Sequence, residues 1–246
     1  MDDRSTGPAP LEHPGPAAAR RVDTAHGPSP VDDPRALTIL TTEHWSLLSA
    51  RSLVYNEAFS RAGMFLSFLA ATLVALGLMS GAMGFSSEFI GISALVLGLD
   101  LFIGLATMGR VATATSEDIR FLQGMNRLRH AYHETVPGLD PYFITGHHDD
   151  VLGIFANYGA DVQTRTWRSI VHGFTTVVGM LGVINAALSG VVAATIAILI
   201  VGESVAAIAI GVGAFLVVLA ISVAWSTRAI AATVAGLQPR FPSPGA

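Results

Sequence analysis

Apolar residues fill two zones of the chain, roughly 62–109 and 169–227, and more polar sequence separates them. Residues 62–85 carry no charge, and as a helix they would extend ~36 Å, enough for a hydrocarbon core of ~30 Å. After a short turn at 86–88, a second apolar run covers 89–109 and contains one charge, Asp100. Since only helices and closed barrels satisfy their backbone inside lipid, runs of this length predict a first transmembrane helix pair at 62–109.

The second zone leaves two interpretations open. Residues 169–202 contain no Asp, Glu or Arg, and one helix of that length would reach ~51 Å, too long for an ordinary span. Either the first turns of a single long helix lie outside the hydrocarbon, or a hairpin turns near 185–190. We favour the single helix, because it pairs with a last span at 205–226 and keeps the number of spans even. The zone 169–227 is then a second transmembrane pair.

The polar segments also have helical spacing. Before the first zone, apolar residues recur every three or four positions and predict an amphipathic helix over 37–61. We expect it to start near Thr42, with Thr41 or Thr42 as the N-cap. The segment 110–168 should continue the second span as a helix to about His133, break at 137–141, and resume as a helix after Thr145.

Composition and charge narrow the class of protein. The chain is 51% hydrophobic, 13% charged and has a net charge of −4, which argues against a nucleic-acid partner. The absence of cysteine excludes disulfides and thiolate metal sites. Twelve of the arginines precede the first span or lie in 110–168, so the positive-inside rule places both termini in the cytoplasm.

These observations together predict an all-α protein of the cell membrane, a four-transmembrane-helix bundle with helical cytoplasmic extensions. Residues 1–36, which are rich in proline, form a disordered N-terminal tail, and 228–246 form a C-terminal tail. The lipid bilayer is the partner that this composition implies. Signatures of nucleotide-binding, hydrolase and metalloprotease sites are absent from the sequence, so we expect no enzyme activity and no cofactor.

Asp100 is the strongest functional candidate, because an acid near the middle of a bilayer is costly and is usually conserved for function or paired. It lies ten positions before Arg110 and twelve after Glu88. One hypothesis is a proton or cation site in a small channel or transporter; the other is a protonated acid that hydrogen-bonds a neighbouring helix. Four polar residues could accompany it: Thr72, Thr175, Thr176 and Asn185.

A second candidate lies in the cytoplasmic segment, where histidines and acids cluster. Imidazole and carboxylate at this spacing can bind zinc or another transition metal. The alternative is a helix start at Asp149 and Asp150, since acids stabilise the positive end of the helix dipole. The candidate ligands are His130, His133, His147, His148, Asp149 and Asp150.

Small residues at four-residue spacing allow close approach of helices in lipid. Gly77 and Gly81 have this spacing in the first span, and Ala207 and Gly211 have it in the last. They could pack the four helices of one chain, or they could form the interface of a homo-oligomer. A structural or assembly role, with such self-association, is the first function hypothesis; the channel and the metal-binding protein are the alternatives.

Two stretches carry a family resemblance. Residues 36–67 (ALTILTTEHWSLLSARSLVYNEAFSRAGMFLS) and 141–159 (PYFITGHHDDVLGIFANYG) resemble uncharacterised four-span integral membrane proteins of the actinobacterial type. The resemblance covers about 36–228 and implies a topology without an activity. A weaker likeness is to SLATT-type membrane effectors, in which a helix bearing Arg and Tyr also runs into a close pair of spans.

Overall fold

The computed structural model describes residues 30–158, 176–202 and 205–244. Four long helices dominate it: α1 (Ala36–Met83), α2 (Ser87–Thr135), α5 (Val177–Val201) and α6 (Val205–Ala235). Each is long and apolar enough to cross a membrane. The predicted all-α fold with four spans is therefore confirmed.

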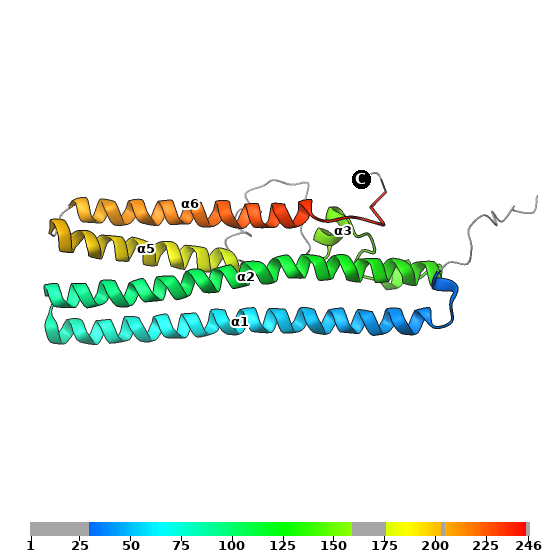
Figure 1. Cartoon of the computed structure of the whole chain (residues 1–246), viewed down its shortest axis with the longest axis horizontal. Helices are drawn as coiled ribbons and strands as arrows, with labels where there is room; N and C mark the ends of the chain where they lie inside the picture. The colour runs from blue at the N-terminus through cyan, green and yellow to red at the C-terminus, as the bar shows by residue number, and fades with distance from the viewer. Residues whose placement is uncertain (1–29, 159–175, 203–204, 245–246) are drawn as a thin grey trace, which may run out of the picture.

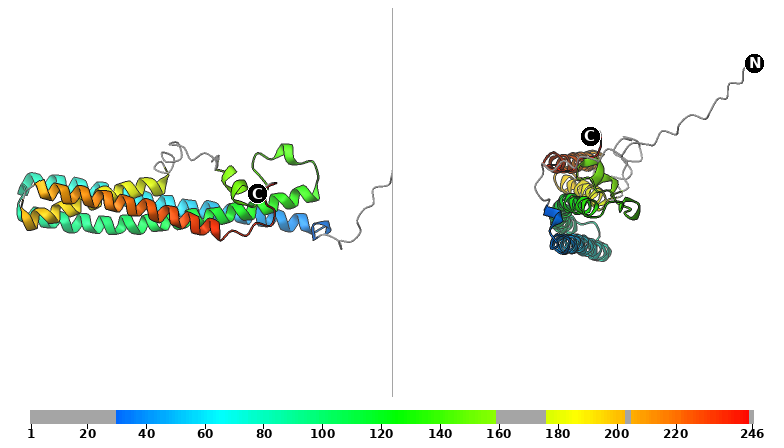
Figure 2. Two further views of the ribbon diagram at one scale, coloured as in Figure 1. Left: turned by 90° about the horizontal axis from the view of Figure 1, so that it is seen from above. Right: turned by 90° about the vertical axis from the view of Figure 1, so that its right-hand side faces the viewer.

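The helices lie side by side in the order α1, α2, α5, α6 (Figure 1), and an end-on view shows the same order (Figure 2). Helix α1 packs mainly on α2, α2 packs on α5, and α5 packs on α6, while α6 also reaches α2. Helix α1 therefore lies at one edge of the row. Most of the surface that it turns away from α2 contacts no other element among the described residues.

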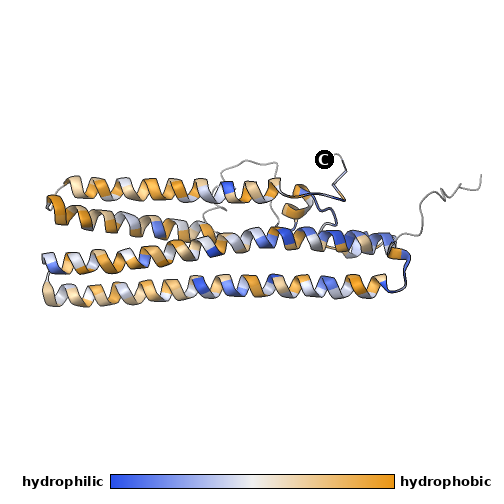
Figure 3. Ribbon diagram, viewed as in Figure 1, coloured by the Kyte–Doolittle hydropathy of each residue, from blue (hydrophilic) through white to orange (hydrophobic). Residues whose placement is uncertain are grey.

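Short elements cover the end of α2. They are the 3-10 helices η1 (Pro30–Asp32) and η2 (Asp140–Tyr142) and the one-turn helix α3 (Val151–Ala156). Figure 3 shows that polar residues gather at this end of α1 and α2, while the opposite half is largely apolar. We call residues 30–61, 110–158 and 228–244 the polar end, and residues 62–109, 177–202 and 205–227 the apolar half.

Several predictions about helix boundaries can be compared with the structure. Helix α2 continues past the second span to Thr135, as expected. Helix α5 runs unbroken through 185–190, which excludes the hairpin interpretation; residues 169–175 lie outside the described residues.

Other boundaries were wrong. Helix α1 begins at Ala36, and the predicted caps lie inside it, where the Thr41 and Thr42 hydroxyls donate to the carbonyl oxygens one turn earlier. A threonine in mid-helix bonds back in this way, so its presence did not mark a start. The helix expected after Thr145 begins at Val151, with Asp150 as its N-cap, and α3 ends at Ala156; the predicted continuation over 159–168 lies outside the described residues.

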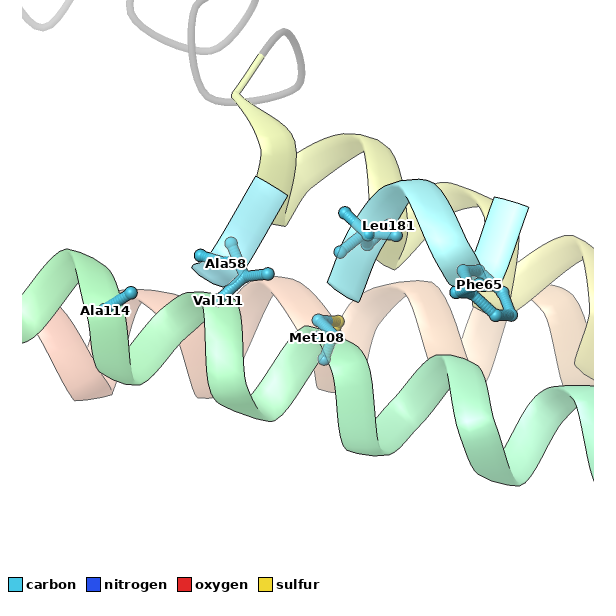
Figure 4. Close-up of a cluster of buried hydrophobic side chains, with 7 residues drawn as sticks. Ala58, Phe65, Met108, Val111, Ala114 and Leu181 are labelled. Atoms are coloured by element: carbon cyan, nitrogen blue, oxygen red, sulfur yellow. The ribbon is translucent and has the colours of Figure 1, made fainter. Parts of the chain in front are cut away.

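The main apolar cluster lies where α1, α2 and α5 meet. Figure 4 shows Phe65 of α1, Met108 and Val111 of α2, and Leu181 of α5 turned toward one another. Phe65 is 1% exposed and Leu181 is fully buried. This packing sets the level of the helices against each other, and so it fixes which polar side chains can meet in the apolar half.

Candidate functional site

Asp100 lies inside the apolar half on the packed face of α2. Its side chain is fully buried, and neither carboxyl oxygen has a hydrogen-bond partner among the described residues. The Thr72 hydroxyl of α1 faces this carboxyl, but the geometry is not that of a hydrogen bond. Buried polar groups in proteins nearly always have a hydrogen-bond partner. The described helices give Asp100 none, so the presence of an acid here requires another explanation.

Asn185 of α5 enters the same core. It is fully buried, and a Cβ placed on Gly104 would come 2.0 Å from its Oδ1 and 2.7 Å from the Phe65 ring. Gly104 therefore provides the space that the amide occupies, one helical turn from Asp100. Both polar atoms of Asn185 also lack a hydrogen-bond partner among the residues described.

The other residues predicted around Asp100 differ in place. Thr176 is exposed at the N-cap of α5, where its hydroxyl accepts from the Gly179 N–H at 3.1 Å. Asn185 is nine residues further along α5, a distance of ~13 Å, so Thr176 does not reach the level of Asp100, contrary to our expectation. Thr175 lies outside the described residues.

One more unsatisfied group shares this face of α2. The Ser93 hydroxyl is buried without a hydrogen-bond partner in the part of the chain that the structure describes. Ser93 precedes Asp100 by seven residues, which is two turns along the same face. Ser93, Asp100 and Asn185, with Thr72 beside them, form what we call the intramembrane polar core.

At the polar end, buried acids are satisfied instead. Asp118 of α2 is 1% exposed and accepts hydrogen bonds from the Arg51 guanidinium and from the Tyr55 hydroxyl at 2.9 Å. The Tyr158 hydroxyl donates to the same carboxylate. Burial, together with this carboxylate, raises the pKa of the Tyr158 hydroxyl, so Tyr158 remains a donor. The network joins α1, α2 and the segment after α3.

An ion-pair network marks the edge between the two halves. Glu57 of α1 pairs with Arg110 of α2 at 2.7 Å and with Arg61 at 2.9 Å. These two guanidinium groups lower the pKa of the Glu57 carboxyl to about 2. Charges of both helices are thus matched where the apolar half begins.

The turn before α3 holds the segment that follows α6. The Asp149 carboxylate accepts from Arg127 Nε at 2.7 Å and from the backbone N–H groups of Arg240 and Phe241 at 3.0 and 2.7 Å. Asp150 accepts from the N–H groups of Gly153 and Ser243 at 2.8 and 2.9 Å. Donors from the chain itself thus occupy the oxygens of Asp149 and Asp150, and the alternative of a helix start holds for Asp150, which caps α3.

The predicted histidines do come together. Ring centroids of His147 lie 4.5 Å from His133 and 4.2 Å from His148, and 5.6 Å from His130. The acid beside them is Asp140, whose Oδ1 lies 3.4 Å from His133 Nδ1 and 3.5 Å from His147 Nδ1. Burial, and then the neighbouring histidines, lower the pKa of His147.

The small residues divide into two kinds. A Cβ on Gly211 of α6 would meet Ala194 Cβ and the Gly190 carbonyl oxygen of α5 at 2.8 Å, and Ala207 is 1% exposed. These residues pack α5 on α6. Gly77 and Gly81 of α1 are exposed, and a Cβ there would meet nothing within 4 Å among the described residues.

Sequence reasoning missed two features, Asp140 as a neighbour of the histidines and Asp118 as the centre of a network. Arg51 and Tyr55 are four residues apart, so they share a face of α1, and this spacing could have indicated a common acceptor. No local signal points to Asp118 as that acceptor, because it is distant in sequence and the register of α1 on α2 decides the pairing.

The fold and its apolar half fit one class, the all-α multi-pass integral membrane proteins, because four helices are long and apolar enough to cross a membrane. Comparison with known protein families, with curated proteins and with solved structures gave no match. The resemblance to four-span proteins of the actinobacterial type therefore stays a prediction, and any specific role must be argued from this chain's own residues.

Proposed function

We propose that this protein binds a proton or a small monovalent cation at Asp100 and moves it across the membrane. The observation that carries this proposal is that the Asp100 side chain is fully buried at membrane depth with no hydrogen-bond partner for either oxygen among the described residues. A role as helix-to-helix glue would require a hydrogen bond from a neighbouring helix; the Thr72 hydroxyl of α1 faces the carboxyl but lies outside hydrogen-bond geometry.

The physical reason is the cost of an unpaired carboxylate in hydrocarbon, which amounts to several kcal/mol even by the lower scales. A bound proton removes the charge, and a bound cation neutralises it. The unsatisfied oxygen of Asn185 lies against Gly104, one turn along α2 from Asp100, and oxygen is the ligand that hard cations take. Ser93 extends the set of unsatisfied oxygens toward the turn between α1 and α2.

Flux through reconstituted vesicles tests this proposal. The purified full-length protein in liposomes should carry protons or Na⁺ down an imposed gradient, followed by an internal pH-sensitive dye and by ²²Na⁺ uptake. Asp100→Asn should abolish this flux. Thr107→Val is the matched control, because Thr107 is also buried on α2 but donates to its own helix at Ile103; its flux should match wild type. Flux equal to that of empty liposomes, or undiminished by Asp100→Asn, would overturn the proposal.

A second candidate function is assembly through self-association, and the open face of α1 favours it. Gly77 and Gly81 form a small-residue pair with free space above it, and such pairs let the backbones of two helices approach closely. We propose a second copy of this chain as the occupant. Gly77→Leu with Gly81→Leu should convert a dimer to a monomer in multi-angle light scattering.

The control for this second proposal is Ala71→Leu, which places a leucine at an exposed position of α1 on a different face. That variant should remain dimeric. A monomeric wild-type protein, or a double variant that stays dimeric, would refute self-association through this face.

A further inference from the structure

Four imidazole rings meet at the polar end, outside the membrane and away from Asp100. His130 and His133 lie one turn apart on α2, and His147 and His148 come from the loop that crosses back over the helix. The ring of His147 lies within 5.6 Å of each of the other three, measured between centroids. Imidazole nitrogens gathered in this way are ligands that transition metals commonly take.

Three groups of this cluster have the geometry of a metal site. Suitable ligand atoms of His133, Asp140 and His147 all lie within 4.8 Å of one another. The Asp140 Oδ1 is 3.4 Å from His133 Nδ1 and 3.5 Å from His147 Nδ1. In a tetrahedral zinc site with bonds of ~2.1 Å, two ligand atoms are separated by ~3.4 Å. Two of the three edges therefore already have the length that a bound metal requires.

Several ring nitrogens of the histidine cluster have no hydrogen-bond partner in the described parts of the chain. His133 Nε2, His130 Nδ1 and His148 Nδ1 are buried without a hydrogen-bond partner among the described residues. Asp140 is exposed, with 71% of its side chain accessible, whereas the His133 side chain is only 12% accessible. The site is thus walled by histidine on the protein side and is open to solvent on the carboxylate side, which gives an ion a path of entry.

We propose that His133, Asp140 and His147 bind a divalent first-row transition metal, with zinc as the first choice, and leave one position for water. Two imidazoles and one carboxylate are borderline-to-hard ligands that suit such ions. This site is independent of the function proposed for Asp100.

Bound metal would fix the loop at 136–150 to the end of α2. His147 is two residues before Asp149, which holds the segment at 238–243 through Arg127, Arg240 and Phe241. Phe241 also stacks on His130 at 4.0 Å between centroids. Metal binding and docking of this segment should therefore support each other, because both require the same loop conformation.

Calorimetric titration of the metal-free, full-length protein in detergent with zinc chloride tests the site. One equivalent should bind saturably, with a dissociation constant in the micromolar range or below. His133→Gln and Asp140→Asn should each weaken binding at least ~10-fold, the lower limit seen for loss of even an outer-shell partner. His44→Gln is the matched control, because His44 stacks on Tyr132 and is not a member of the group.

Two results would overturn the proposal: no saturable heat with zinc, or equal affinity in wild type and in Asp140→Asn. The exposed Asp140 side chain makes the second comparison safe, since its replacement removes no buried contact. Cobalt(II) gives an independent readout, because a tetrahedral site with nitrogen and oxygen ligands shows intense visible absorption. This absorption should appear in wild type and in His44→Gln and should be lost in His133→Gln; equal spectra in all three would also refute the site.

Discussion

Two buried acids on one face of α2 have opposite surroundings. Asp100 and Asp118 are 0% and 1% exposed, and they are eighteen residues apart, which is five turns and returns to the same face. Asp118 has three donor residues, two from α1 and one from the segment after α3, whereas Asp100 has none among the described residues. Burial is therefore common to both, and hydrogen bonding separates an acid that holds the fold together from one that remains available for a ligand.

Removing the charge of Asp118 should give the largest loss of stability. Asp118→Asn leaves the Arg51 guanidinium without its counter-ion, and breaking a buried pair costs about 3–5 kcal/mol; the partial exposure of Arg51 places the expected loss near the lower end. Chemical denaturation in detergent, followed by circular dichroism, measures it. Asp33→Asn breaks only an exposed pair with Arg35 and should leave stability close to that of wild type, because exposed ion pairs contribute little. Equal effects of the two variants would contradict the role of Asp118.

Asp149 should show the next largest effect, confined to the polar end. Asp149→Asn removes the charged acceptor for Arg127 and for two backbone N–H groups, and hydrogen bonds to charged groups contribute about 1.5–3 kcal/mol each. The segment at 238–243 should then detach. Trypsin cleavage after Arg240 should become several-fold faster, while Asp32→Asn, at an exposed position, should leave that rate unchanged.

Lowering the pH should also release the segment at 238–243, and the direction of the pKa shift of Asp149 predicts the pH range. Burial acts to raise the pKa of Asp149, but the hydrogen bonds from Arg127, Arg240 and Phe241 outweigh it and lower the pKa below the ordinary 3.8. A group with a lowered pKa stabilises the folded state above its unfolded pKa, and it loses that contribution as the pH falls through the folded value. In the metal-free protein, docking should thus be constant from pH 7 to 5 and should weaken only below pH 3.8, as an acid-stable fluorophore near the C-terminus would report. Release near pH 5 would refute it.

Helix packing offers a smaller test within the apolar half. Gly211→Leu places side-chain atoms against Ala194 and the Gly190 carbonyl, and overpacking costs about 1–3 kcal/mol. Gly213→Leu, two residues further on, meets nothing within 4 Å among the described residues and should unfold like wild type. Both are read from thermal melts in detergent. Equal melting temperatures of the two variants would show that the close contact of α5 and α6 at Gly211 does not contribute to stability.

The sequence predicted the elements better than their contacts. Charge-free runs are local properties, so they identified four spans, and the even number of spans favoured the continuous helix that the structure shows at 177–201. Threonine at 41 and 42 misplaced the start of α1, because the residue can cap a helix or bond back within one.

Pairings across helices depended on register, which no single segment encodes. The sequence singled out Asp100 and Asn185, because polar residues in apolar runs are conspicuous. It did not single out Asp118 or Asp140, which are acids in polar segments where acids are expected. The histidine cluster was predicted from spacing. Its acidic partner, Asp140, lies in the turn at 140–142, and the sequence alone does not show that this turn brings Asp140 back beside the histidines.

The smallest expected change in stability is also the most informative. Asp100→Asn keeps the shape of the side chain and removes no hydrogen bond that the described residues make, so stability should stay within about 1 kcal/mol of wild type. Asp118→Asn, the same substitution five turns along the same face, is the control with the opposite expectation. Parallel denaturation of the two variants measures both. If Asp100→Asn destabilised the protein as much as Asp118→Asn does, Asp100 would have structural partners, and the contrast between the two acids would fail. If it leaves stability unchanged, the acid at this depth is retained for what it binds, because the fold does not depend on it.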